Sequence, residues 1–246
     1  MKSKILESLI KLIVWEDENY FIINKPYGVS SLDERFGCSK NNILRMAREY
    51  CPTAQLCHRL DKETSGVMAI AKNPEAYRHL AIQFEKREVK KIYHAIVKGT
   101  HNLDGVEVNY PIAPAGNSSV KIDYHKGKLA LSYFQTLKMF KDATLVECFP
   151  ITGRMHQIRI HLAQLKAPIV SDKQYGGRDI FLSSLKRNFK LKKNTEEKPI
   201  IQRIALHAFA ISFKPLNSQN QVTVSAAYPK DFKVLLKILE EYSQLF

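Results

Sequence analysis

Several signatures of well-known chemistry are missing from this sequence. Its four cysteines, Cys38, Cys51, Cys57 and Cys148, include no CxxC pair, and no His/Cys spacing matches a zinc site. A Gly-rich phosphate-binding loop and a GxSxG nucleophile elbow are also absent. We therefore expect reduced thiols in a cytoplasmic protein, with no metal site and no serine-hydrolase chemistry.

Long hydrophobic runs are absent as well. The first twenty residues contain apolar positions, but Glu7 and Lys11 interrupt them and no small-residue cleavage site follows. This stretch predicts neither a signal peptide nor a membrane span, so we expect a soluble protein without a membrane partner.

Acidic residues are scarce relative to basic ones. The 246 residues include 24 Asp and Glu against 38 Lys and Arg, which leaves a net charge of +14. A surplus of this size indicates a polyanionic partner, because each neutralised phosphate releases counterions. The alternative is a basic surface that has no such partner.

Strand-like runs outnumber helical ones along the chain. Residues 12–16 and 20–24 flank a polar turn and predict a β-hairpin. Helices are predicted over residues 40–50, from Asn73 onward with Asn73 as the cap and Pro74 at the first helical position, over 153–166, and over 231–246 with one apolar stripe. This pattern favours an α+β fold with a largely antiparallel sheet.

The chain shows no internal repeat and no Gly/Ser-rich linker. We therefore expect a single catalytic domain over residues 1–246. The lysine-rich run 184–198 is expected to form a basic surface loop, because charge runs are commonly solvated.

The stretch CHRLDKETSG, residues 57–66, places an aspartate between basic residues and a turn. Side chains from Leu56 to Asp61 alternate as on a strand that ends at Asp61. Thr64, Ser65 and backbone amides of the turn could then hydrogen-bond the carboxylate, which could act as a covalent nucleophile. An aspartate that merely caps its own turn is the commoner arrangement, and this segment alone favours it.

The stretch ITGRMHQIRIHLAQL, residues 151–165, places an arginine in an apolar stripe. If it is helical, Met155, Arg159 and Leu162 share one face. A buried arginine needs a carboxylate partner, and Asp61 is a candidate. Such an ion pair would hold the Asp61 carboxylate in one orientation. Alternatively, the guanidinium extends past the stripe to solvent.

The stretch KKIYHAIVKG, residues 90–99, reads as a strand. Tyr93, Ala95 and Val97 alternate on one of its faces. Taken alone, Tyr93 is best explained as a core aromatic residue whose hydroxyl is hydrogen-bonded.

Together, HRLDKETSG, KKIYHAIVKG and TGRMHQIRIHL, in this order, closely resemble the motifs of the RluA-type pseudouridine synthases. NKPYGVSS, residues 24–31, is similar to the NKPxGxx segment of the same family, and the likeness covers about residues 15–230. The resemblance implies isomerisation of specific uridines in ribosomal or transfer RNA, without metal, cofactor or ATP. It also implies a mixed, mostly antiparallel sheet with a central cleft flanked by helices.

The resemblance also implies residue roles. Asp61 matches the nucleophile, Tyr93 the tyrosine that lies against the target base, and Arg159 the basic residue that pairs with the nucleophile. Arg59 matches the arginine that enters the RNA stack after the target nucleotide has flipped out, and Leu162 matches an apolar residue of the pocket wall. Flipping is physically required, because the reacting carbon must reach a small pocket.

The start of the chain differs from that of several longer relatives. The chain starts almost directly with the catalytic segment, without the N-terminal S4 RNA-binding domain of several relatives, which favours a compact stem-loop substrate. Nothing in the sequence demands a dimer, so we expect a monomer.

Two other functions compete with the synthase interpretation of these residues. A retaining glycosidase also attacks an anomeric carbon with a carboxylate, but it needs a second carboxylate about 5 Å away, for which Glu63 is the nearest candidate in this loop. A catalytically inactive RNA-binding module would be favoured if Asp61, Tyr93 or Arg159 were missing, and all three are present.

Overall fold

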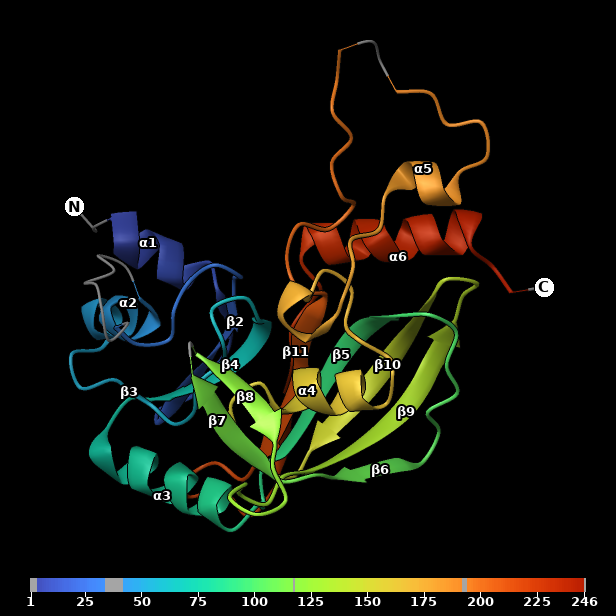
Figure 1. The fold of residues 1–246 in the computed structure, drawn as a ribbon. Helices are drawn as coiled ribbons and strands as arrows, with labels where there is room; N and C mark the ends of the chain where they lie inside the picture. Colours follow the sequence, from blue (N-terminus) through green and yellow to red (C-terminus); the bar gives the residue numbers. More distant parts are fainter. Residues whose placement is uncertain (1–3, 34–41, 117, 192–193, 246) are drawn as a thin grey trace. The chain divides into compact units, whose positions relative to one another are not determined.

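The computed structural model describes residues 4–33, 42–116, 118–191 and 194–245. The chain divides into two compact units. Figure 1 labels helices and strands of both. Unit 1 comprises Met1–Ile92 and His207–Ala227, and unit 2 comprises Tyr93–Leu206 and Tyr228–Phe246. Cys38 and the first residues of the helix predicted over 40–50 lie outside the described residues.

Unit 1 is built on a sheet with helices packed against it. Its elements are α1 (Lys4–Ile10), β1 (Ile13–Glu16), β2 (Tyr20–Lys25), α2 (Ile43–Tyr50), β3 (Gln55–Leu56), β4 (Ser65–Ala71), α3 (Pro74–Glu85), β11 (Leu206–Phe213, whose first residue belongs to unit 2) and β12 (Val222–Ser225).

Strand β4 is the centre of the unit 1 sheet, and all seven of its residues are buried. It pairs antiparallel with β2 and β3 and parallel with β11, while β12 pairs antiparallel with β11. The predicted hairpin is confirmed, because β1 and β2 pair antiparallel across the turn. The strand that precedes the DKETSG turn is much shorter than predicted, as β3 ends at Leu56.

Helix α3 begins as the sequence predicts, with Asn73 as its cap. The Asn73 side chain accepts a hydrogen bond from Ala76 N at 2.9 Å, and Pro74 occupies the first turn. Its buried face contains Ala76, Leu80 and Gln83, whereas Tyr77 is exposed. The helix packs against β3 and β4.

Unit 2 combines a second group of paired strands with a hairpin and further helices. Its elements are β5 (Lys90–Lys98, whose first residues belong to unit 1), β6 (Val106–Asn109), β7 (Ile112–Gly116), β8 (Ser119–Ile122), β9 (Leu131–Met139), β10 (Ala143–Pro150), α4 (Gln157–Gln164), the 3-10 turn η1 (Lys173–Tyr175), α5 (Leu182–Leu185) and α6 (Lys230–Tyr242).

The unit 2 strands pair antiparallel in the order β5, β10, β9, β6, and β7 pairs with β8 as a separate hairpin. Helix α4 packs against β9 and β10 and also against β8, as Figure 1 shows. The core of the unit includes Val97 and Val146 from the strands, Leu162 from α4, and Leu235 from α6. Mostly antiparallel strands with packed helices confirm the predicted α+β class.

Helix α6 and the run 184–198 complete unit 2. Helix α6 buries Phe232, Leu235 and Leu239, members of its predicted apolar stripe. The run 184–198 begins in the last residues of α5 and continues as turns and coil through its described part, where Lys186 and Lys190 are exposed. No helix within the described residues combines the length and apolarity that a membrane crossing requires.

Candidate active site

Asp61 lies in the loop that joins β3 to β4 in unit 1. The predicted strand through Asp61 is wrong beyond Leu56, and His58 explains why. Its Nε2 accepts a hydrogen bond from Ala69 N of β4 at 2.9 Å. If β3 were longer, one of its backbone carbonyls would accept this hydrogen bond instead. The chain therefore leaves the sheet at this point and forms a loop.

Burial and the nearby Lys91 charge lower the pKa of His58 to about 3, so the imidazole is neutral and Nε2 can accept. The ring also lies against Phe84 of α3, with centroids 5.0 Å apart. The histidine of the HRLD motif is therefore a structural residue that fixes where the loop starts.

The loop itself is a tight turn. Thr64 N donates to Asp61 O at 3.0 Å. The Asp61 side chain is half-buried, and Arg59, two residues earlier, is exposed. A half-buried carboxylate and an exposed arginine therefore lie on one loop.

The end of the loop is fixed by Ser65 and Gly66. Ser65 is buried, and its Oγ lies 2.9 Å from His207 Nδ1, while His207 Nε2 bonds Ala226 O at 3.1 Å. The Ser65 hydroxyl therefore anchors the turn to β11, a contact that the sequence did not predict. Gly66 has φ +118, and a Cβ there would overlap the Ala208 carbonyl oxygen, so only glycine fits.

Tyr93 lies on β5 in unit 2, opposite Cys148 of β10. Residues 94–97 of this strand are all buried, on both of its faces, whereas Tyr93 is half-buried at the edge of the core. Its ring is thus held by the core on one side and keeps some accessible surface.

Helix α4 starts later than predicted, at Gln157 instead of Gly153. The Gln157 side chain holds the preceding residues in a loop, because its Oε1 accepts from Thr152 Oγ1 at 2.7 Å and from Arg154 N at 3.0 Å. Met155 therefore precedes the helix and is exposed, and the prediction that it shares a helical face with Arg159 is wrong.

Arg159 is buried, with 5% of its surface exposed, and its carboxylate partner is Asp172. Nε and Nη2 donate to the two carboxylate oxygens at 2.7 and 2.8 Å. Nη2 also donates to Gln174 Oε1 at 2.9 Å, and the guanidinium lies 4.9 Å from the centre of the Tyr175 ring. Burial of Arg159 predicted a carboxylate partner, with Asp61 as a candidate, and in the structure Asp172 supplies that carboxylate.

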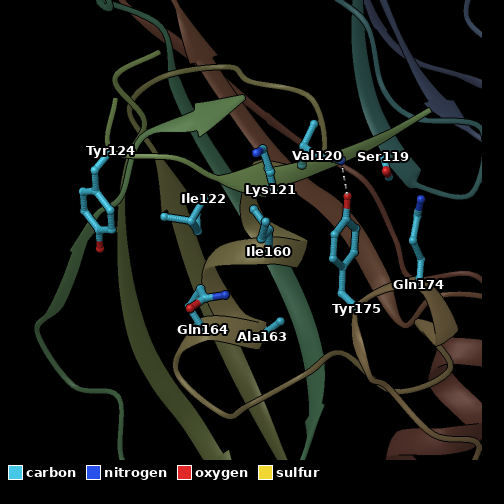
Figure 2. A pocket seen from close by; sticks show the side chains of 10 residues that line it. All are labelled: Ser119, Val120, Lys121, Ile122, Tyr124, Ile160, Ala163, Gln164, Gln174 and Tyr175. Atoms are coloured by element: carbon cyan, nitrogen blue, oxygen red, sulfur yellow. Dashed lines mark hydrogen bonds between the residues drawn. The ribbon is translucent and has the colours of Figure 1, made fainter. Parts of the chain in front are cut away.

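A pocket of about 730 Å³ lies between β8 and α4, and its lining includes Gln174 and Tyr175, which contact Arg159. Figure 2 shows Lys121, Gln164, Gln174 and Tyr175 around it. The Tyr175 hydroxyl accepts from Val120 N at 3.0 Å, which ties the η1 turn to β8. The wall is largely polar, so the pocket could accept hydrogen-bonding groups.

Leu162 is fully buried in the unit 2 core. This burial favours a packing role over the expected place in the wall of an RNA-binding pocket. Within the described part of the chain, no group of three or more His, Cys, Asp or Glu side chains is arranged to hold a metal ion.

Comparison with known proteins identifies the family. A family model described as RNA pseudouridylate synthase matches residues 19–164. The chain is 35% identical over 235 residues to ribosomal large subunit pseudouridine synthase C of Buchnera aphidicola subsp. Baizongia pistaciae, a match that covers 93% of this chain and 70% of that protein. It is 33% identical over 236 residues to ribosomal large subunit pseudouridine synthase D of Buchnera aphidicola subsp. Acyrthosiphon pisum, covering 94% and 74% respectively.

A solved structure shares the fold. Human RNA pseudouridylate synthase domain containing 4 superposes with a TM-score of 0.72 at 24% identity, and the match covers 98% of this chain and 96% of that one. These findings confirm the resemblance of the sequence motifs. The chain belongs to the RNA pseudouridylate synthase family.

Proposed function

We propose that this protein converts specific uridines of structured RNA to pseudouridine, with Asp61 as the nucleophile. The observation that carries the proposal is the anchoring of the Asp61 turn, by His58 on one side and Ser65 on the other. A reacting carboxylate must be held in a fixed position, because misplacement by about 1 Å can cost on the order of 100-fold in rate.

In the proposed reaction, the bond between uridine N1 and the ribose anomeric carbon breaks, and a bond from C5 to that carbon forms. Asp61 either adds covalently to the substrate or assists formation of a glycal intermediate. C5 then loses its proton, a step that we assign to Tyr93 by its match to the family motif. N1 gains a proton, so the product is an isomer of the substrate.

Two arginines have different proposed roles. Arg59 is exposed beside Asp61, and we assign it to the gap that the flipped nucleotide leaves in the RNA stack, where its plane can replace a base. Arg159 donates two hydrogen bonds to Asp172. This pairing supports a structural role for Arg159, in which it holds α4 and the η1 turn in place, over direct contact with the nucleophile.

The proposed substrate is ribosomal RNA of the large subunit, because the similar proteins are named for that target. Transfer RNA is the second candidate. A net charge of +14 supports a polyanionic substrate in either case, and binding should be salt-sensitive.

The test is release of tritium from RNA labelled at uridine C5, since isomerisation replaces the C5–H bond. Unmodified large-subunit ribosomal RNA and transfer RNA are incubated separately with the protein. We expect release from ribosomal RNA that reaches a fixed number of uridines per molecule. Binding to both RNAs without release from either would contradict the proposal and favour an inactive RNA-binding module.

A further inference from the structure

We propose that Ser31 and Lys25 are positioning residues for the loop that carries Asp61. Both belong to residues 24–31, NKPYGVSS, a segment to which the proposed reaction assigns no role. This inference rests on the proposed function, because it takes Asp61 as the reacting group. The segment bonds the backbone of the residues on either side of Asp61.

Ser31 bonds both backbone groups of Leu60, the residue immediately before Asp61. Its Oγ donates to Leu60 O at 2.7 Å and accepts from Leu60 N at 3.2 Å. Both residues are buried, with exposed fractions of 5% and 6%. Since the chain has left the sheet here, Leu60 has no strand partner, and a buried backbone group needs one. One hydroxyl therefore fixes the backbone next to Asp61.

The residue after Asp61 is held by the same segment. Lys62 O accepts from Gly28 N at 2.8 Å and from Lys25 Nζ at 3.3 Å. Leu60 and Lys62, which flank Asp61, are thus both bonded to residues of 24–31. Movement of this segment would move the backbone of the proposed nucleophile.

Lys25 is an unusual residue for a role limited to packing. Its side chain is fully buried, and Nζ also donates to Val29 O at 2.8 Å and to Pro26 O at 2.9 Å. Burying an ammonium group is costly unless it is well hydrogen-bonded. The Lys25 ammonium group donates to carbonyls of its own segment and to a carbonyl of the Asp61 loop, so its hydrogen bonds link the two backbone segments.

The consequence for catalysis is a loss of rate without a loss of RNA affinity. Ser31 is buried and acts through the backbone of Leu60, so its removal should leave contacts with RNA intact. Because Asp61 would be less well oriented, we expect the single-turnover rate of Ser31→Ala to fall by about 10- to 100-fold.

The experiment compares Ser31→Ala with Ser212→Ala, a matched control. Ser212 is also a buried serine of unit 1, with Oγ bonded to Thr223 Oγ1 at 2.7 Å, and it lies near the opposite end of β11 from the Ser65 contact. Single-turnover tritium release, RNA affinity and urea unfolding are measured for the wild type and each variant. If Ser31→Ala does not fold, Ser31→Cys replaces it, since a thiol fills similar space with weaker hydrogen bonds.

We expect the Ser31 variant to lose rate while its RNA Kd stays within about twofold of wild type and Ser212→Ala keeps the full rate. Equal rates in the Ser31 and Ser212 variants would overturn the inference, as would a rate loss fully explained by weaker binding. Absence of release by the wild type would instead count against the proposed function.

Lys25 is tested in the same way against Lys72→Met. Lys72 follows the opposite end of β4, where its Nζ donates to Asp17 O and pairs with Glu16 at 2.6 Å. We expect Lys25→Met to reduce the single-turnover rate and Lys72→Met to leave it unchanged. Equal rates in these two variants would remove Lys25 from the inference.

Discussion

Arg159 and Asp172 form a two-pronged ion pair in which the arginine side chain is 6% exposed and the aspartate side chain is fully buried. Removing one partner leaves an uncompensated buried charge, so Asp172→Ala should reduce the free energy of unfolding by about 3–5 kcal/mol. Urea unfolding measures the loss.

The neighbouring pair of Lys173 and Asp179 is the control. Its atoms lie 3.1 Å apart, but the lysine side chain is 78% exposed. Asp179→Ala should therefore cost no more than about 1 kcal/mol. Similar losses in the two alanine variants would show that the buried pair does not hold α4 and the η1 turn together.

Gly66 should tolerate no side chain. Its φ of +118 and its close approach to Ala208 combine backbone strain with overlap, so Gly66→Ala should cost about 3 kcal/mol or more in unfolding free energy. Gly28 has φ +78 with no atom within 4 Å of a Cβ position, so Gly28→Ala should cost only about 1–2 kcal/mol. Equal losses would mean that the contact with β11 is not tight.

The neutral state of His58 should make unit 1 sensitive to acid. Its folded pKa of about 3 lies below the ordinary value of 6.5, so the unfolded chain binds a proton that the folded chain does not. Stability is therefore fully present above about pH 6.5 and is lost as the pH falls from there toward about 3.

This effect can be isolated with His58→Gln, which keeps an acceptor but does not titrate. Between pH 7.5 and 5, the wild type should lose up to about 2 kcal/mol more unfolding free energy than the variant. Urea unfolding at both pH values gives the difference. An identical pH dependence in the two proteins would show that His58 is not held neutral.

Local signals in the sequence predicted local structure well. The turn between β1 and β2 and the cap at Asn73 both depend on neighbouring residues, and both were correct. The alternation around Tyr93 did not predict burial in this way, because residues 94–97 are buried on both faces of β5.

Hydrogen bonds between side chains and the backbone were not predictable in this way. The strand before Asp61 ends early because the side chain of His58 replaces a backbone acceptor, and helix α4 starts late because Gln157 bonds the residues before it. Neither effect changes the hydrophobic pattern.

The partner of Arg159 shows the same limit. Burial of the arginine correctly indicated a carboxylate, but nothing in the pattern distinguished Asp172 from Asp61. Ser31 and His207, which anchor the Asp61 loop, were also missed, since a serine or histidine within a motif carries no sign of its distant partner.

The most direct test of the account is the effect of Asp61→Asn on tritium release from C5-labelled RNA. The asparagine keeps the size of the side chain and cannot serve as the carboxylate nucleophile. We predict that the variant binds RNA with wild-type affinity and unfolds at the wild-type urea concentration, yet releases no tritium. Release by Asp61→Asn at a rate near that of the wild type would contradict the assignment of Asp61 as the nucleophile.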